Sequence, residues 1–459
     1  MPSQQPNNSP ATPLILDDSA HAPAPLTSVD GAMGGAAGAG TSTMLGGALK
    51  DTKHPKSPKH PKQTRYWMRL VPAMFILAWG GNHFTPLLHL YEDLGNYEVW
   101  QANFLLGTYV AGLIPGLLVA SALSDKYGRK PVMFAGMFLA MAGSLLLALG
   151  FQVFWELCVG RMLAGIGVGI AMSVGTSWMK ELSGAPYDVH AGASAGARRP
   201  SLTLTLGFGI GAVATGVLAQ WAPMPALLPY VLHGTLSVVA LFWLAVTPES
   251  LPPENRTTSS WWQDLRVPSA GHRTFTRLIM PAAPWVFGAA AVAYAIMPSS
   301  VAAQMGDYTT IYAAGLTILT LGVGAAVQPF YPRINQATGG RAIAVGMFVL
   351  VTGLVLAVVA VILASPVFVI LVDAVLGAGY GITLVSGLAQ VQRIATPSDL
   401  AGLTGIYYSL TYVGFLLPTI LAMLLPVMSY AVSLSLVTAL CAVCLVAVLA
   451  EYRRMRRAA

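Results

Sequence analysis

Twelve long apolar runs constrain this chain more than any other feature of its sequence. Each has about 20 residues or more, which is the length that a helix needs to cross the hydrocarbon core of a bilayer. They lie near residues 67–90, 99–123, 131–150, 153–178, 201–221, 227–247, 278–298, 308–330, 342–364, 367–391, 400–424 and 427–450. Because 55% of the residues are hydrophobic and only 9% are charged, one water-soluble core cannot bury them. The sequence therefore predicts an all-α integral membrane protein with twelve transmembrane helices.

The charged residues indicate how these helices are oriented. If both termini lie in the cytoplasm, nearly every Lys and Arg falls in the N-terminal arm, a cytoplasmic loop or the C-terminal tail. The predicted outer loops hold no basic residue and instead contain Glu92, Asp93, Glu98 and Asp307. Because positive charge is retained on the cytoplasmic side, we expect a multi-pass protein with both termini cytoplasmic. The alanine-, valine- and arginine-rich composition is typical of high-GC bacteria and favours an inner or plasma membrane.

An internal repeat relates the first six apolar runs to the last six. Residues 159–175 read VGRMLAGIGVGIAMSVG, and residues 371–387 read LVDAVLGAGYGITLVSG. A shift of 212 positions carries Gly165, Gly167 and Gly169 onto Gly377, Gly379 and Gly381, and it carries Gly128-Arg129 onto Gly340-Arg341. One offset that works at separate places indicates homologous halves, so we predict two pseudo-symmetric six-helix bundles. We expect the repeated glycines to let neighbouring helices pack closely.

The apolar runs also divide the chain into predicted domains. Residues 1–64 are rich in Pro, Ala, Gly and Ser and are expected to form a disordered cytoplasmic arm without a cleavable signal peptide. Residues 65–247 form the predicted N-terminal bundle, and residues 278–459 form the C-terminal bundle with a short basic tail. Between them, residues 248–277 are predicted to be a cytoplasmic linker that carries a short interfacial helix around Ser259–Asp264.

A charged turn separates the second and third apolar runs. It reads Ser124-Asp125-Lys126-Tyr127-Gly128-Arg129-Lys130-Pro131. This pattern resembles the cytoplasmic loop between the second and third helices of the major facilitator superfamily of transporters. The resemblance implies a cytoplasmic gate formed by Asp125, Gly128 and Arg129, in which Asp125 faces the start of the eleventh helix. Because Ala337 stands at the position of the aspartate in the second half, we expect the stronger gate contact in the first half.

Few ionisable side chains lie inside the predicted spans, where an arginine costs roughly 2.5–3.5 kcal/mol. Arg161 in the fourth span and Asp373 in the tenth occupy equivalent positions under the shift of 212. The resemblance implies that both helices line a central cavity and links the arginine to proton transfer. We therefore expect the two side chains to meet directly or to bind a substrate jointly. The alternative is a purely structural ion pair between the halves.

The first span carries two further candidates near its midpoint, Asn82 and His83. A histidine titrates near neutral pH, so His83 is a candidate to sense or carry a proton. The alternative is a neutral histidine that is hydrogen-bonded within the bundle. His233 in the sixth span is a weaker candidate, since the resemblance makes its helix peripheral to the cavity. The predicted substrate- and proton-coupling residues are therefore Arg161, Asp373, Asn82 and His83.

The resemblance implies a secondary transporter in which the two halves rock about a central site. We expect proton-coupled efflux of a small organic or drug-like molecule by alternating access. The alternative is proton-coupled uptake of a small metabolite, such as a carboxylate held by Arg161. The fifth span has the glycines typical of the family's exporters, but Ala212 stands where they carry a proline.

Several other classes of protein do not fit the sequence. It contains no nucleophile–base set, no cluster of metal ligands and no phosphate-binding glycine loop outside the predicted spans. We therefore expect neither an enzyme nor a protein that binds a cofactor, a metal or nucleic acid. The expected partners are a small-molecule substrate, protons and the lipid bilayer. The twelve spans complete the fold in one chain, so a monomer is expected.

Overall fold

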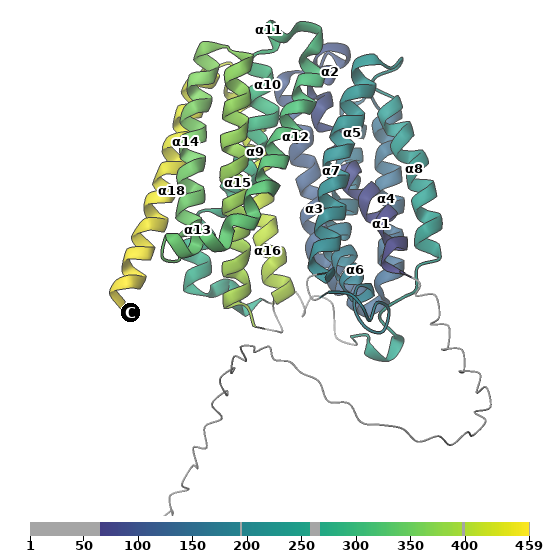
Figure 1. Cartoon of the computed structure of the whole chain (residues 1–459). Helices are drawn as coiled ribbons and strands as arrows, with labels where there is room; N and C mark the ends of the chain where they lie inside the picture. Colours follow the sequence, from purple (N-terminus) through teal and green to yellow (C-terminus); the bar gives the residue numbers. More distant parts are fainter. Residues whose placement is uncertain (1–64, 193–194, 258–266, 397–399, 459) are drawn as a thin grey trace, which may run out of the picture. The chain divides into compact units, whose positions relative to one another are not determined.

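The computed structural model describes residues 65–192, 195–257, 267–396 and 400–458, and the structural statements below concern these residues. The predicted arm 1–64 and the predicted interfacial helix Ser259–Asp264 lie outside them. The described residues form helices and connecting turns and contain no strand (Figure 1). The all-α class predicted from the apolar runs is therefore confirmed.

The first half of the described chain contains eight α-helices. They are α1 (Trp67–Asn82), α2 (Leu88–Gly95), α3 (Val99–Tyr127), α4 (Arg129–Leu149), α5 (Phe154–Ile170), α6 (Thr176–Leu182), α7 (Ala195–Trp221) and α8 (Leu228–Ala245). A 3-10 turn (Thr85–Leu87) leads into α2, and a π-helical turn (Ala171–Gly175) joins α5 to α6. Further 3-10 turns lie at Pro253–Asn255 and Pro268–Gly271 in the described parts of the connection to the second half.

The described part of the second half is divided into more helical pieces than the first. Its α-helices are α9 (Ala283–Ala291), α10 (Met297–Ser300), α11 (Ala302–Met305), α12 (Thr309–Val327), α13 (Tyr331–Ala337), α14 (Ala342–Leu363), α15 (Pro366–Ile394), α16 (Leu400–Val413), α17 (Leu417–Leu424) and α18 (Tyr430–Ala458). Two π-helical turns (Phe275–Ile279 and Val292–Ile296) flank α9. The 3-10 turns are Gly306–Tyr308, Gln328–Phe330 and Gly414–Leu416.

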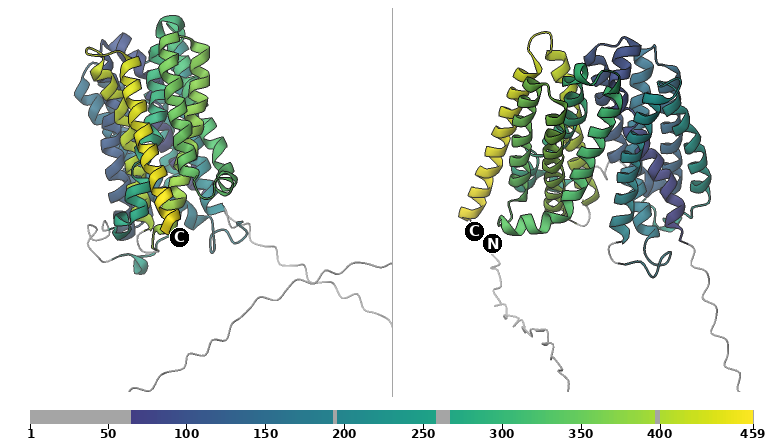
Figure 2. Two further views of the ribbon diagram at one scale, coloured as in Figure 1. Left: turned by 90° about the vertical axis from the view of Figure 1, so that its left-hand side faces the viewer. Right: turned by 45° about the horizontal axis from the view of Figure 1, so that its top comes forward.

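Eleven helical stretches among the described residues are long and apolar enough to cross a membrane. The remaining predicted span, 67–90, is broken in its last third, because α1 ends at Asn82 and α2 begins only at Leu88. Pro86 lies in this break, and a proline has no N–H to continue the helical hydrogen bonds. The fold is thus a twelve-helix bundle in two halves, as predicted. The two halves meet along α7 and α12 and along α3, α16 and α17. Figure 2 shows the two halves side by side.

Glycines place the same pairs of helices in close contact in both halves. In the first half, a Cβ on Gly165 of α5 would collide with the carbonyl oxygen of Tyr109 on α3. In the second half, a Cβ on Gly377 of α15 would lie 2.7 Å from the carbonyl oxygen of Thr320 on α12. The remaining glycines of the pattern also face neighbouring helices, namely Gly167, Gly169, Gly379 and Gly381. Small residues are what allow backbones to approach this closely.

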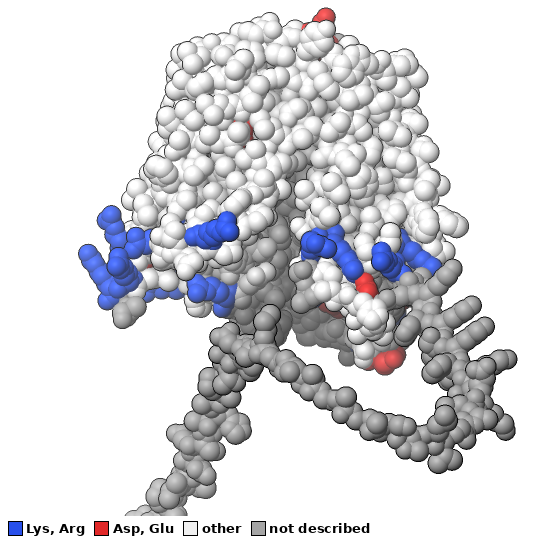
Figure 3. Space-filling model, in the orientation of Figure 1, with Lys and Arg blue, Asp and Glu red and all other residues white. Residues whose placement is uncertain are grey.

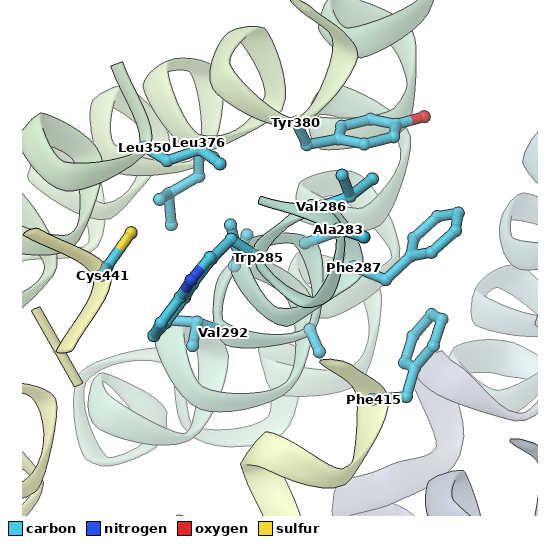
Figure 4. Close-up of a cluster of buried hydrophobic side chains, with 14 of the residues drawn as sticks. Ala283, Trp285, Val286, Phe287, Val292, Leu350, Leu376, Tyr380, Phe415 and Cys441 are labelled. Carbon is cyan, nitrogen blue, oxygen red and sulfur yellow. The ribbon is translucent and has the colours of Figure 1, made fainter. Parts of the chain in front are cut away.

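The α9 helix divides its side chains between a buried core and the interface of the halves. Trp285 of α9 and Val292 of the π-helical turn after it lie on the side of Leu350, Leu376 and Cys441, which come from α14, α15 and α18 (Figure 4). Figure 4 shows Phe287 on the other side of the same helix, next to Phe415. Because residues two apart in an α-helix lie about 200° apart around its axis, Trp285 and Phe287 serve opposite faces.

Charged side chains mark the two ends of the bundle. On the face shown in Figure 3, Lys and Arg side chains gather at one end, and an acidic side chain marks the opposite end. We call the first of these, which includes the α3–α4 turn and the last turns of α18, the basic end. This distribution agrees with the predicted orientation, in which the basic end is cytoplasmic.

Candidate functional site

A cavity of about 580 Å³ lies between the two halves. Its first-half wall comes from α1, α3, α5, α6 and α7, and its second-half wall from α9, α12, α15, α16 and the turns beside α9 and α16. Lys180, Gln392 and Thr404 line it near the basic end, whereas Asn82 and Arg161 line its deep part. Figure 3 shows the hollow between the halves at the basic end. The cavity therefore extends inward from that end.

The opposite end of the bundle is closed by contacts between the halves. The Thr419 hydroxyl donates to the carbonyl oxygen of Asn103 at 2.9 Å, joining α17 to α3 in a buried position. The Gln220 amide donates to the carbonyl oxygen of Asp307 at 2.8 Å. The cavity is therefore open at the basic end, and contacts between the halves close the bundle at the opposite end.

Arg161 lies at the deep end of the cavity and is only 1% exposed. Its Nε donates to the carbonyl oxygen of Leu105 at 3.3 Å. The guanidinium carbon lies 4.4 Å from the ring centre of Phe84 and 4.6 Å from that of Tyr109. Its Nη1 atom has no hydrogen-bond partner, and none of the described carboxylates forms an ion pair with it. Arg161 is thus held by aromatic faces and one carbonyl, with donors left over.

Asp373 does not meet Arg161 in this conformation. Its Oδ2 accepts a hydrogen bond from the Thr320 hydroxyl at 3.1 Å, and its Oδ1 has no partner. The side chain is fully buried between α15 and α12, and it is not part of the cavity wall. The expectation that Arg161 and Asp373 meet or share a substrate therefore does not describe this conformation, and it stays a prediction for other conformations.

Asn82 and His83 are neighbours in sequence but face different surroundings. Asn82 lines the cavity, where its Nδ2 donates to the carbonyl oxygen of Phe208 at 3.2 Å and its Oδ1 accepts from Thr85 at 3.0 Å. His83 is fully buried outside the cavity wall, and both of its ring nitrogens lack a partner. The helix therefore presents only one of the two predicted residues to the cavity.

His233, the weaker candidate, lies directly against His83. Their ring centres are 4.9 Å apart, and the ring centre of Tyr230 lies at the same distance from that of His83. The His233 ring interacts with the Ser144 hydroxyl at 2.7 Å and with the carbonyl oxygen of Ile76 at 3.0 Å. Sequence reasoning could not find this pair, because the two histidines are 150 residues apart and nothing in their spacing relates them.

A group of stacked aromatic rings, which we call the aromatic wall, lines the second-half side of the cavity. Phe287 stacks on Tyr412 with ring centres 4.3 Å apart and on Phe415 with centres 5.3 Å apart. Tyr294 and Tyr380 complete the wall (Figure 4 shows Tyr380 with Phe287 and Phe415). The substrate- and proton-coupling residues predicted from the sequence, Arg161, Asp373, Asn82 and His83, include none of these aromatic side chains.

The predicted gate residues lie together at the basic end. Gly128 has a φ of +102°, a conformation that L side chains rarely adopt, and it allows the sharp turn between α3 and α4. Arg129 then reaches back to Asp125 at 2.5 Å and across to Glu181 at 2.9 Å. No hydrogen bond joins the Asp125 carboxylate to the described residues of α16. In this open state the aspartate is therefore paired within its own half.

Two glutamates that the sequence analysis did not select complete this cluster. Glu181 lies in the last turn of α6 and pairs with Arg129. Glu249, just after α8, accepts hydrogen bonds from the backbone N–H groups of Arg129 at 3.1 Å and Lys130 at 2.9 Å. A carboxylate in this position satisfies free N–H groups at the start of α4 and interacts favourably with the helix dipole. In the sequence, the signal for these two glutamates is that they are acidic residues in segments predicted to be cytoplasmic, where basic residues predominate.

Comparisons with known proteins place this architecture in a family. The sequence model of the Major Facilitator Superfamily matches residues 70–417. One segment is 29% identical over 128 residues to the probable inositol transporter 3 of Arabidopsis thaliana, covering 26% of this chain and 22% of that protein. Another is 33% identical over 87 residues to the multidrug resistance protein MdtL of Klebsiella pneumoniae (strain 342), covering 19% and 22%.

A third relative is the 3-(3-hydroxy-phenyl)propionate transporter of Escherichia coli (strain K12), 30% identical over 114 residues, which cover 24% of this chain and 27% of that protein. The matches thus span less than a third of these relatives' lengths. The crystal structure of the nucleoside transporter NupG shares the fold with a TM-score of 0.64 at 12% identity, over 84% of this chain and 98% of that one. Because the family model covers most of the chain and the twelve-helix fold agrees with it, this protein belongs to the major facilitator superfamily and is a multi-pass membrane transporter.

Proposed function

We propose that this transporter exports a small organic or drug-like molecule by alternating access, driven by proton antiport. The observation that carries the proposal is the cavity of about 580 Å³, which is open at the basic end, closed at the opposite end and lined mainly by apolar and aromatic side chains. Ligand sites of this size and lining suit small amphipathic molecules. Similarity to a multidrug resistance protein supports the direction. We place the protein in the inner or plasma membrane as a monomer with cytoplasmic termini.

Proton coupling is proposed to involve Asp373 together with Arg161, Asn82 and His83. The Oδ1 atom of Asp373 is buried without a hydrogen-bond partner, so a charge on this carboxylate would be poorly compensated in this state. Burial favours the neutral form of a carboxyl group, and an approaching arginine favours the charged form. A movement that brings the two halves' polar groups closer would thereby release a proton, and the reverse movement would take one up.

The gate is proposed to act at the α3–α4 turn. In the open state, Arg129 holds the Asp125 carboxylate within the first half. When the basic end closes, the carboxylate would instead meet the N-terminal end of α16, where free N–H groups favour an anion. Glu181 would remain as the partner of Arg129 in both states.

Proton-coupled uptake of a small metabolite is the second candidate. It is favoured by Arg161, which lines the cavity without a carboxylate partner, and by the similarity to an inositol transporter and to a phenylpropionate transporter. Export and uptake use the same cavity and gate, and they differ only in which side releases the substrate.

The test is a transport assay in everted, respiring membrane vesicles that contain the protein. Acridine-orange fluorescence reports the proton gradient while lipophilic cations, antibiotics and organic acids are added one at a time. Dequenching that needs the wild-type chain and is lost in Asp373→Asn supports proton antiport. Absence of any response, in vesicles shown to contain folded protein, refutes export of these classes and directs the work to uptake of labelled metabolites.

A further inference from the structure

Among the described residues, the charged groups that line the cavity are all of one sign. Arg161 lies at the deep end, Lys180 lies near the basic end, and no Asp or Glu contributes to the wall. Arg198 lines an adjoining groove of about 340 Å³, which shares Phe208 and Tyr380 with the cavity. None of these three basic side chains forms an ion pair with a described carboxylate. Side chains of one sign in a low-dielectric cleft concentrate ions of the opposite sign.

Arg161 is the position in this wall that most needs an acceptor. A guanidinium carries five N–H donors, and the structure gives this one a single hydrogen bond, from Nε to the Leu105 carbonyl. The faces of Phe84 and Tyr109 stabilise the cation but accept no strong hydrogen bond. A buried charge that is left without a partner is costly, so the remaining donors favour a bound group with two acceptor oxygens.

From this arrangement we infer that the substrate is an amphipathic organic anion, whose acidic group binds Arg161 and whose apolar body lies against the aromatic wall. This inference rests on the proposed transport through the same cavity and adds the substrate class. A carboxylate or another oxyanion would take the free donors of Arg161, while Phe287 and Phe415 would stack on an aromatic or alicyclic body.

The same geometry disfavours two other classes of substrate. An organic cation would be placed near an unpaired guanidinium with no carboxylate in the wall to offset the repulsion. A sugar-like polyol needs hydrogen-bond acceptors as well as donors at the deep end. The Asn82 oxygen there already accepts one hydrogen bond from the Thr85 hydroxyl, so the deep end offers more free donors than free acceptors. An organic anion is the class of substrate that matches the positive charge and the free hydrogen-bond donors of Arg161 at the deep end.

The test is equilibrium binding of three matched probes to the purified, full-length protein in detergent, in a buffer of low chloride. The probes are 3-phenylpropionate, 3-phenylpropionamide and 3-phenylpropylamine, which share a ring and chain and differ in charge. Calorimetric titration is expected to show the carboxylate binding at least about tenfold more tightly than the amide, since a charged hydrogen bond contributes about that factor or more. The amine is expected to bind most weakly.

Variants then locate the binding energy. Arg161→Gln should lower the affinity for the carboxylate to that for the amide, whereas Arg161→Lys should retain part of the difference because it keeps the charge but loses the fork. Phe415→Ala should weaken the carboxylate and the amide by the same factor. Arg454→Gln removes an arginine that is 64% exposed on α18, and it should change neither affinity. Melting curves in detergent establish which variants are folded. If Arg161→Gln is not folded, the comparison is made with Arg161→Lys instead.

The inference is overturned if the amide or the amine binds as tightly as the carboxylate, if folded Arg161→Gln keeps the wild-type preference, or if no probe binds at millimolar concentration. Binding at equilibrium needs no proton gradient and no direction of transport. Carboxylate binding without dequenching in vesicles would therefore leave the substrate class standing and refute proton-driven export. Dequenching by cations alone would support proton-driven export and refute an anionic substrate.

Discussion

Replacing Gly165 by alanine tests whether the close approach of α5 to α3 holds the first half together. The added Cβ would collide with the carbonyl oxygen of Tyr109 and lie 2.9 Å from the backbone nitrogen of Leu113. Because both atoms belong to the backbone, no rotamer change can relieve the contact, and the helices must separate. Overpacking of this kind costs about 1–3 kcal/mol, and the backbone contact places this site at the upper end of the range.

The alanine also has a favourable effect, since it stabilises a helix by about 1 kcal/mol relative to glycine. The expected net loss is therefore about 2 kcal/mol, which corresponds to a melting temperature about 4–8 °C lower for a unit of this size. The matched control is Gly209→Ala on α7, where a Cβ would meet no atom within 4 Å. There the same substitution should leave stability unchanged or raise it by about 0.4–1 kcal/mol.

The assay is thermal unfolding of the two purified variants and the wild type in the same detergent, followed by tryptophan fluorescence. Gly377→Ala serves as the second-half counterpart, since its Cβ would lie 2.7 Å from the carbonyl oxygen of Thr320. If Gly165→Ala and Gly377→Ala melt at the same temperature as Gly209→Ala, the helices do not depend on these approaches and the reasoning is wrong.

Three further perturbations address the gate, the closed end and the buried carboxylate. Glu249→Ala removes the acceptor for the N–H groups of Arg129 and Lys130 and should lower the free energy of unfolding by about 0.5–2 kcal/mol, measured as a lower melting temperature. The control is Glu254→Ala, which removes no cap of a described helix and should leave the melting temperature unchanged. Thr419→Val removes the hydrogen bond to the Asn103 carbonyl, worth about 1 kcal/mol, and should shift the population away from this conformation by about fivefold. The readout is slower alkylation of a cysteine placed at Ser201 in the cavity wall, and an unchanged rate would contradict the role given to this contact. Asp373→Asn should keep the hydrogen bond with Thr320 and the fold but abolish pH-driven uphill transport, so a variant that still transports uphill refutes the coupling role.

Some features of the fold and of the cavity were predictable from the sequence, and others were not. The twelve spans, the all-α class and the family were predictable, because each depends on hydrophobicity summed over about 20 neighbouring residues or on a compact motif such as Asp125 to Arg129. Arg161 and Asn82 were selected as charged or polar groups inside spans, and both line the cavity. Phe287 and Phe415 were not selected, because an aromatic residue in an apolar run carries no sign of which way it points.

The sequence did not predict which side chains on helices far apart in the chain face each other. Asp373 was expected to meet Arg161 or to bind a substrate jointly with it, since the repeat gives both the same depth, but in this conformation it is bonded to Thr320 outside the cavity wall. Depth is a property of position along one helix, whereas facing depends on the rotation of that helix about its axis. A rotation of 100° per residue separates Asn82, which lines the cavity, from His83, which lies against His233.

What the sequence determined by itself is therefore what hydrophobicity and spacing control along one chain: the spans, the predicted orientation from basic residues, the repeat and the family. Only the tertiary structure decided which side chains meet, as when Glu249 binds the N–H groups at the start of α4 and Arg161 is left with aromatic faces and free donors. It also decided which end of the cavity is open, through contacts such as that of Thr419 with Asn103. The physical reason is that these pairings depend on the rotation and tilt of helices, and packing sets these through close contacts between residues that are far apart in the chain.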